Sequence, residues 1–414
     1  MKIHQSPVIA FVCFFLLFQN LGNAQPFGDL LIKKGVKKVD IPFEYENNFI
    51  IVKVTFNDVF PLKFIFDTGA EHTILTRREI TDLLQINYDR QFKIKGADLS
   101  TNLYAYLARG VKLTIHNMIA ENRSILVLEE DYFRFEEFGG INVQGIIGAD
   151  LFRRYVVKID YRRKVITIYD PHHFKQPDSH FQEIPVEFHR NKPYLFAGTI
   201  FAKDTIPQAK YLMDTGASIA LLLYTNGQPK VELPPQFITT KIGMGLGGYL
   251  EGFLGRTEQL GIGNFPLEDV ITNFQEIPPD ADTTYLNGRN GIIGNQVLNR
   301  FTMIVDYING KVYFKPEKKF RQKFQYDKSG IILAASGINL NIFTVVDIIK
   351  GSPAEKAGIL IGDEIKKVNG IPAILLRLES ILQRFRGKSG KKVHLLIERN
   401  TAKIKKQIVL QDLI

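Results

Sequence analysis

The tetrapeptide Asp-Thr-Gly-Ala occurs twice in this chain of 414 residues, at 67–70 and again 147 residues later at 214–217. Each copy follows an apolar run typical of a buried strand, and more apolar residues come after it. An acidic residue on a glycine-containing turn at the end of such a strand is unusual in a hydrophobic core. Two of them in equivalent contexts predict two carboxylates that meet in the folded protein.

Two further landmarks recur with nearly the same offset. Gly-Ile-Ile-Gly occurs at 145–148 and 291–294, and Asp-Tyr occurs at 160–161 and 306–307, each pair being 146 residues apart. The segments around them alternate short strand patterns with turn residues. We interpret the pattern as the duplication of a β-rich lobe of about 145 residues.

Asp67 and Asp214, brought together across a pseudo-two-fold axis, predict a carboxyl pair that shares one proton. Such a pair offers a general base and a general acid at once, so it can activate a water molecule without a metal or a covalent intermediate. (This dyad is a standard example of split carboxyl pKa values.) The alternative for each aspartate is a satisfied turn or cap residue.

The residues beside the aspartates predict how the pair is held. Thr68 and Thr215 are expected to hydrogen-bond across the axis and keep the two turns in register. Gly69 and Gly216 let backbone amides approach the carboxylates. The Gly-Ile-Ile-Gly segments are expected to pack beneath the turns, where only glycine lets the chains cross.

These motifs resemble those of retropepsin-type aspartic proteases. Asp-Thr-Gly-Ala followed by residues 71–75, with a later Gly-Ile-Ile-Gly-Ala-Asp-Leu, carries the resemblance, and two lobes in one chain are similar to the bilobal pepsins. The resemblance implies an intramolecular dyad and a glycine-rich flap at 241–249 that covers the substrate. The flap and substrate residues that it implies are Gly245, Gly247, Gly248 and Tyr249.

The chain also departs from that family pattern. Ala220 stands where Ser or Thr is usual, and Ala149 and Asn295 stand where retroviral members carry a bracing arginine. In the first lobe no glycine-rich flap is evident, and 95–98 is the best candidate. We therefore expect the second-lobe hairpin alone to cover the cleft.

Residues 1–24 are predicted to be a secretory signal. Lys2 precedes the apolar run 8–18, and the small residues 22–24 suit a signal peptidase. An uncleaved N-terminal anchor is the alternative. Cys13 is the only cysteine, so the mature chain is expected to have no disulfide, no thiol catalysis and no cysteine-bound metal. We expect an exported protein, periplasmic or extracellular.

Residues 326–414 lack the repeated motifs of the two lobes. They resemble a PDZ domain of exported proteases, and the segments 351–359 and 362–370 carry this resemblance. Such domains bind an extended peptide beside a strand and often hold a terminal carboxylate on backbone amides. The expected peptide-binding loop contains Gly330, Ile331, Ile332 and Leu333. The segment 337–340 is its rival, and a module that only packs on the lobes is the alternative.

The net charge of +10 is concentrated at the C-terminal end. Residues 321–414 carry 17 Lys and Arg against 8 Asp and Glu. This surplus favours either an anionic partner or a solvated lysine-rich surface, and we favour the second.

The sequence predicts a mainly β fold with two pseudo-symmetric retropepsin-like β-barrel lobes and a C-terminal PDZ domain, a β-sandwich with two helices. The expected domains are a signal peptide at 1–24, lobes at 25–172 and 173–320, and the PDZ domain at 326–414. The predicted function is an aspartic endopeptidase with a peptide or protein substrate, a PDZ peptide ligand, no cofactor, no nucleic acid and no stable membrane insertion, acting as a monomer. The competing hypotheses are a non-catalytic peptide-binding scaffold and an intermolecular dimer.

Overall fold

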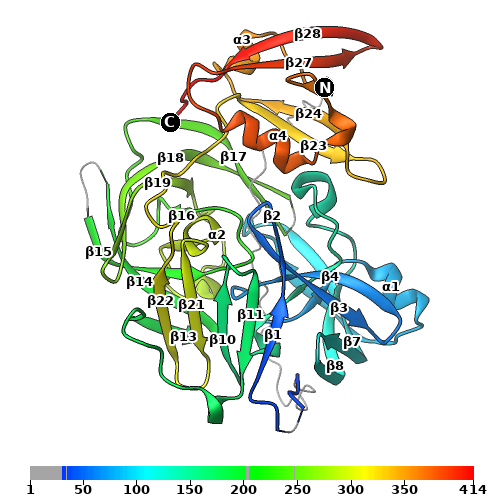
Figure 1. The fold of residues 1–414 in the computed structure, drawn as a ribbon, viewed down its shortest axis with the longest axis vertical. Helices are drawn as coiled ribbons and strands as arrows, with labels where there is room; N and C mark the ends of the chain where they lie inside the picture. The colour runs from blue at the N-terminus through cyan, green and yellow to red at the C-terminus, as the bar shows by residue number, and fades with distance from the viewer. Residues whose placement is uncertain (1–29, 34, 202–204, 247) are drawn as a thin grey trace.

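The computed structural model describes residues 30–33, 35–201, 205–246 and 248–414. Strands dominate this part of the chain, so the predicted mainly β class is confirmed (Figure 1). The predicted signal segment and Gly247 lie outside the described residues. Within the described part, none of the helices has the length and apolar character that a membrane span requires.

The first lobe is built on one eight-stranded sheet. Alternate residues of its longest strand are buried, as Leu103 and Ala105 show, because successive side chains point to opposite faces. An extra pairing of β3 with β7 folds the sheet back on itself. In sheet order the strands are β2 (Glu44–Glu46), β3 (Phe49–Phe56), β4 (Phe60–Phe66), β9 (Gly145–Ile147), β5 (Ile74–Leu75), β8 (Met118–Leu128), β7 (Asn102–Ile115) and β6 (Tyr88–Lys95).

The second lobe repeats this sheet strand for strand. Its extra pairing, β14 with β18, corresponds to β3 with β7. The same topology from two halves of one chain agrees with the duplication inferred from the motifs. In sheet order the strands are β13 (Val186–His189), β14 (Lys192–Ile200), β15 (Thr205–Met213), β20 (Gly291–Ile293), β16 (Leu221–Tyr224), β19 (Phe265–Gln275), β18 (Gly248–Ile262) and β17 (Phe237–Gly245).

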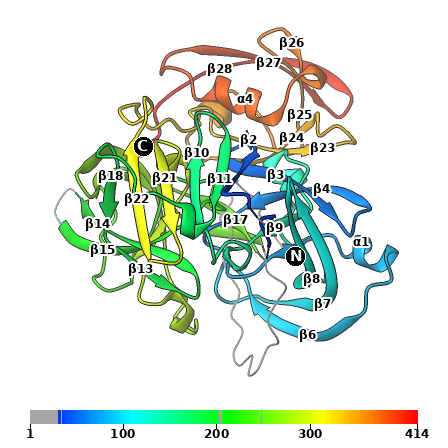
Figure 2. The ribbon, with the colours of Figure 1, turned by 60° about the horizontal axis from the view of Figure 1, so that its bottom comes forward.

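A six-stranded sheet joins the lobes (Figure 2). Strands β10 and β21 pair antiparallel at its centre, so the two halves of the repeat meet there. In order, the strands are β1 (Lys38–Pro42), β11 (Val165–Tyr169), β10 (Val156–Asp160), β21 (Phe301–Asp306), β22 (Lys311–Pro316) and β12 (Gln182–Ile184).

The helices of the lobes are short. A helix at 77–84 with Thr76 as its cap is predicted, but α1 begins one residue later with Arg77 at its N-cap and no side-chain cap bond. The helical segments expected at 149–155 and 295–301 shrink to about one turn, because the chain must enter β10 and β21 directly afterwards. The helices are α1 (Arg78–Leu83), η1 (Phe135–Gly139), η2 (Ala149–Leu151), η3 (Pro171–His173), η4 (Thr284–Leu286) and α2 (Asn295–Leu298).

The C-terminal residues form a separate sheet with helices packed on it. Ser352 Oγ accepts a hydrogen bond from the Glu355 amide at 3.3 Å and caps α3, as its sequence predicts. Leu378 and Ile381 of α4 face the core at helical spacing. The elements are β23 (Ile331–Ser336), β24 (Ile342–Ile348), α3 (Pro353–Lys356), β25 (Glu364–Val368), β26 (Ile371–Pro372), η5 (Ala373–Leu375), α4 (Leu378–Phe385), β27 (Lys392–Arg399) and β28 (Ala402–Val409).

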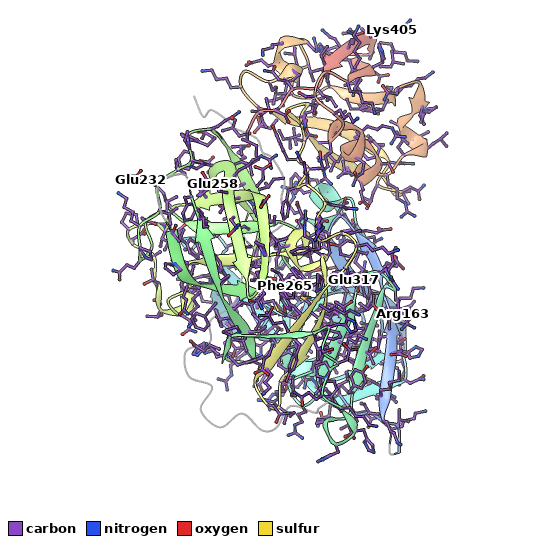
Figure 3. The ribbon with its side chains drawn as sticks, turned by 60° about the vertical axis from the view of Figure 1, so that its left-hand side comes forward. Arg163, Glu232, Glu258, Phe265, Glu317 and Lys405 are labelled. Atoms are coloured by element: carbon purple, nitrogen blue, oxygen red, sulfur yellow. The ribbon has the colours of Figure 1, made fainter. Side chains whose placement is uncertain are left out.

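This C-terminal domain rests on both lobes. Ala334 joins an apolar cluster of the first lobe, and Arg377 forms an ion pair with Glu46 of β2. On the second lobe, Lys241 Nζ of β17 lies 3.9 Å from Asp347 Oδ2 of β24. Figure 3 shows the exposed Lys405 of β28 at the end of the domain farthest from the lobes, which fits a solvated basic surface.

Candidate active site

Each motif aspartate follows the last residue of a buried strand. Asp67 comes after β4 and Asp214 after β15, and their amides donate to the carbonyls of Ile147 and Ile293, both at 3.0 Å. These acceptors belong to the two Gly-Ile-Ile-Gly segments, which run parallel to the aspartate strands. The repeated motifs therefore meet pairwise in each lobe.

The glycines of these segments sit where no side chain has room. A Cβ on Gly148 would lie 2.6 Å from the carbonyl oxygen of His72, and one on Gly294 would lie 2.5 Å from that of Ile219. Real Cβ atoms do not approach backbone so closely. The predicted crossing of chains beneath the aspartate turns is therefore present in both lobes.

The two carboxyls lie together at the interface between the lobes. Asp67 and Asp214 are 1% and 0% exposed, and the Asp67 carboxyl donates a hydrogen bond to the Asp214 carboxyl. Asp67 Oδ1 accepts from the amides of Gly69 at 2.7 Å and Ala70 at 3.1 Å, and Asp214 Oδ1 accepts from Gly216 at 2.8 Å. Apart from the other carboxyl, no donor among the described residues reaches either Oδ2, which leaves these atoms for the proton that the pair shares and for a water molecule.

Burial and mutual repulsion keep a proton on this pair. Burial, and then the charge of Asp214, raise the pKa of Asp67 well above its ordinary value. Burial raises the pKa of Asp214 to about 6, while the hydrogen bond from Asp67, the Gly216 amide and the charge of Arg289 act against that rise. Asp214 is therefore the carboxyl that ionises first, and Asp67 keeps the proton.

Two threonines lock the turns together. The Thr68 amide donates to Thr215 Oγ1 at 3.0 Å, and the Thr215 amide donates to Thr68 Oγ1 at 3.1 Å. Each hydroxyl donates in turn to the strand of the opposite lobe, at the carbonyls of Met213 and Phe66. The four bonds are related by the pseudo-two-fold axis and fix the relative position of the two carboxyls.

Both lobes contribute a hairpin over the site, contrary to the expectation of a single flap. The β17–β18 hairpin carries the predicted flap, in which Gly245 pairs with Gly248. Opposite it, the β6–β7 hairpin turns at 96–101, and the Ala97 amide donates to the Leu246 carbonyl at 2.6 Å. The sequence indicated 95–98 only as the best candidate for a first-lobe flap, because this turn is held by Asp98 side-chain bonds rather than by a run of glycines.

The side chain of Tyr249, expected to contact substrate, lies outside the part of the structure described. Leu246, at the tip of the same hairpin, is buried in an apolar cluster of the first lobe. Ala97 and Leu99 of the first-lobe hairpin are buried in a cluster of the second lobe. Each tip is thus anchored in the opposite lobe.

Buried cations near Asp214 are functional candidates that the sequence reasoning did not identify. Arg289 is 5% exposed and lies close enough to Asp214 to favour its ionised form. Lys192 is also 5% exposed, and burial together with the charge of Arg289 lowers its pKa to about 8. Glu71, directly after the first motif, pairs with Arg190 at 3.7 Å across the lobes. The one sequence signal that could have indicated Arg289 is its position two residues before the second Gly-Ile-Ile-Gly segment.

The residues that replace the bracing arginine still hold the site. Asn295 Nδ2 donates to the Asn48 carbonyl at 2.7 Å and to the Thr215 carbonyl, so it ties the lobes beneath the second turn. In the first lobe Asp150 takes the structural role beside Ala149, forming an ion pair with the buried Arg123 and accepting from Thr73 Oγ1 at 3.0 Å. Neither departure leaves a gap in the floor of the site.

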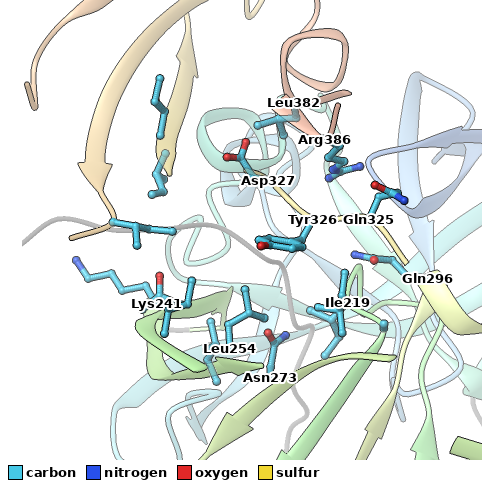
Figure 4. Close-up of a pocket in the computed structure, with 18 of the residues that line it drawn as sticks. Ile219, Lys241, Leu254, Asn273, Gln296, Gln325, Tyr326, Asp327, Leu382 and Arg386 are labelled. Atoms are coloured by element: carbon cyan, nitrogen blue, oxygen red, sulfur yellow. The ribbon is translucent and has the colours of Figure 1, made fainter. Parts of the chain in front are cut away.

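The expected peptide-binding residues of the C-terminal domain lie at the start of β23. Ile331, Ile332 and Leu333 line a cavity that α4 closes on one side (Figure 4). Gly330 precedes them at a φ of +75°, where an added Cβ would collide with the Ser352 side chain. The rival segment 337–340 is the exposed turn between β23 and β24, away from that cavity.

Two lobes of one topology, with paired aspartates between them and a helix-flanked sheet at the C-terminus, define an aspartic protease-like protein with a PDZ module. The family model described as aspartyl protease matches residues 52–151, and the model described as PDZ domain matches residues 344–399. The resemblance stated from the motifs is thus confirmed. No curated protein among those compared matches the chain.

Proposed function

We propose that this protein is an aspartic endopeptidase whose base and acid are Asp214 and Asp67. The observation that carries the proposal is the pair of buried, hydrogen-bonded carboxyls, each with one oxygen that no amide and no other side chain of the described residues reaches. A structural ion pair or a turn cap would not need two acids in contact, because two buried carboxyls in contact destabilise each other's ionised form.

In this mechanism a water molecule lies between the two Oδ2 atoms. Asp214 takes a proton from the water as its oxygen attacks the peptide carbonyl carbon, and Asp67 gives its proton to the carbonyl oxygen. The tetrahedral diol then collapses. The C–N bond breaks while the leaving nitrogen receives the proton held by Asp214, and Asp67 regains its proton from the diol hydroxyl.

Export and the monomeric state belong to the same proposal. Residues 1–24 have the pattern of a cleavable signal, which supports a periplasmic or extracellular location. Both aspartates come from one chain, which supports activity as a monomer. The PDZ module supports the docking of a peptide that belongs to a substrate or a regulator.

The test is peptide hydrolysis by the purified protein and by Asp67→Asn and Asp214→Asn. We expect each variant to lose activity by at least about 1,000-fold, because neither leaves both a base and an acid. Asp280→Asn, at an exposed position, is the matched control and should retain activity.

Circular dichroism of each variant checks that the fold survives. Hydrolysis that persists in either dyad variant would refute the mechanism. Absence of any hydrolysis by the wild-type protein across pH 4 to 8 and a broad peptide library would favour the non-catalytic scaffold instead.

A further inference from the structure

A set of adjoining hollows lies where the PDZ domain meets the lobes. One of them has an empty volume of about 960 Å³, which includes its open mouth. Its walls are β23 and α4 on one side and the second-lobe strands β17, β18 and β19 on the other (Figure 4). Two neighbouring hollows share Gln296 and Arg386 with it, so these residues mark the centre of what we call the junction cavity.

The junction cavity begins where the Asp214 turn ends. Ser218 lines one of its hollows, and Ile219 and Ala220 line another. Lys241 and Ile242 of the β17–β18 flap hairpin form part of the same wall. The cavity therefore adjoins both the Asp214 turn and the flap hairpin, the two elements that flank a bound polypeptide in the proposed function.

The loop that holds a chain terminus in other PDZ domains is already satisfied by this chain. The amides of Ser329 and Gly330 donate to Asp327 Oδ1 at 2.8 and 3.0 Å, and the Ile331 amide donates to Ser329 Oγ at 3.0 Å. The amides of Ser329, Gly330 and Ile331 are therefore not open to the carboxylate of a free C-terminus.

The open donor lies at the other side of the cavity. Arg386, directly after α4, points into the hollow in Figure 4 and is largely withdrawn from solvent. Over the described ranges its guanidinium makes no hydrogen bond or ion pair, and Asp327 and Glu379 act on it only at longer range. A desolvated guanidinium lacking a partner is a site for a carboxylate, which it can bind through two parallel bonds.

The first lobe closes the far end of the PDZ groove. Phe138 of η1 lines the cavity, and Gly140 lies so close to α4 that a Cβ there would stand 2.8 Å from Leu378 Cβ. A ligand therefore cannot run the full length of β23.

Building on the proposed endopeptidase function, we propose that the junction cavity binds the substrate polypeptide itself, with Arg386 holding the carboxylate of an internal Asp or Glu side chain beside the scissile bond. The PDZ module then selects substrates by an acidic residue in the chain rather than by a free C-terminus. Apolar residues of the same segment pack on Ile331, Leu333 and Leu382.

The test uses the full-length protein and one cleavable core peptide, amidated at its C-terminus and extended on either side by a short segment carrying one Glu or one Gln. We expect the Glu extension on one side to lower KM about tenfold relative to Gln, the size of one charge-assisted hydrogen bond. In Arg386→Gln the Glu and Gln peptides should become equal, and Arg386→Lys should restore part of the difference.

Arg384→Gln is the matched control, because Arg384 lies on α4 outside the cavity and should preserve the Glu preference. Equal KM values for the Glu and Gln peptides in the wild-type protein would overturn the proposal. A lower KM for the core peptide with a free C-terminal carboxylate than for its Glu-extended, amidated form would overturn it too. A PDZ domain that binds chain termini behaves in that way.

The binding of the labelled Glu and Gln peptides to Asp214→Asn, measured by fluorescence anisotropy, tests the junction site separately from the proposed endopeptidase function. A Glu preference that depends on Arg386 in that variant supports the junction site even if the wild-type protein hydrolyses nothing. Hydrolysis by the wild-type protein without any such preference overturns the junction site alone.

Discussion

At the scale of single residues, the electrostatics of the dyad depend on a cation that the motifs do not include. Arg289 is buried beside Asp214 and lowers its pKa, in opposition to burial. Because Asp214 must be ionised to act as the base, this arginine extends activity toward lower pH. The dyad is therefore tuned by its surroundings as well as by the contact between the two acids.

Removal of this cation should shift the pH dependence of activity in a predictable direction. Because the pKa of Asp214 is about 6, kcat/KM of the wild-type protein should fall as the pH drops below about 6. Both carboxyls then carry protons, and no base remains. Arg289→Gln should raise the pKa of Asp214 and move this acid limb to higher pH. Arg163→Gln, on an exposed turn of the first lobe, should leave the limb in place. An acid limb that stays fixed in Arg289→Gln would contradict this role.

The same pKa shift predicts how stability depends on pH. The folded protein holds the Asp214 proton more tightly than the unfolded chain, since burial raises the pKa from 3.8 to about 6. The stability that protonation contributes is full below about pH 4 and is lost as the pH rises through 6. Asp214→Asn should thus gain about 2 kcal/mol of stability relative to the wild-type protein between pH 4 and pH 7. Urea unfolding at both pH values measures the difference, and a pH-independent gap would refute it.

At the scale of the elements, the strand-to-turn junctions decide whether the carboxyls can meet. Gly69 lies against the opposite aspartate, and a Cβ on it would stand 2.6 Å from Asp214 Cγ. The tight approach is possible only with glycine in this turn. The hairpins above the site are likewise joined through backbone, at the Ala97 amide and the Leu246 carbonyl.

Gly69→Ala should therefore separate the carboxyls. We expect a loss of activity of about 100-fold or more, because an ångström of displacement in a catalytic pair costs that much, and a destabilisation of about 1 to 3 kcal/mol from overpacking. Gly261→Ala is the control, because its added Cβ would meet nothing closer than 3.8 Å. An unchanged kcat in Gly69→Ala would contradict this prediction, because it would show that the turn accommodates a Cβ without displacing the Asp214 carboxyl.

At the scale of the whole molecule, the PDZ domain is part of the same folded body as the lobes. Ala334 and Val346 of the PDZ domain pack in a first-lobe cluster, and Tyr326 and Ile414 pack in the cluster that spans both lobes. Ion pairs at Arg377 and Lys241 join it to each lobe. The domain therefore has a structural role on the lobes, beside the peptide docking that its resemblance implies.

Thermal unfolding should therefore be cooperative. We expect one calorimetric transition for the full-length protein, with the PDZ domain and the lobes melting together, because their apolar clusters are shared. The protein truncated after residue 323 should melt at a lower temperature, since it exposes that contact surface. Two well-separated transitions in the full-length protein would contradict the shared core.

The sequence alone predicted the central residues of the candidate site but few of the residues around them. Asp67, Asp214 and their glycines were predictable because a repeated motif needs only comparison of the chain with itself. Arg289 and Lys192 were not, because nothing local separates a buried cation from a cation in an ordinary loop. The first-lobe hairpin was indicated only by the candidate turn at 95–98, because Asp98 rather than a run of glycines holds that turn. The cap at Thr76 was wrong since the chain turns into α1 one residue later.

What the sequence by itself determined is the pairing of two equivalent halves, the identity of the acids, and the PDZ character of the C-terminal residues, since repeats and turn chemistry are written in local order. Only the tertiary structure decided that both hairpins close over the dyad, that Asp327 fills the PDZ loop, and that Arg386 faces a cavity shared with the protease lobes. Those contacts join residues far apart in the chain, and they depend on how the domains pack rather than on any segment's own preference.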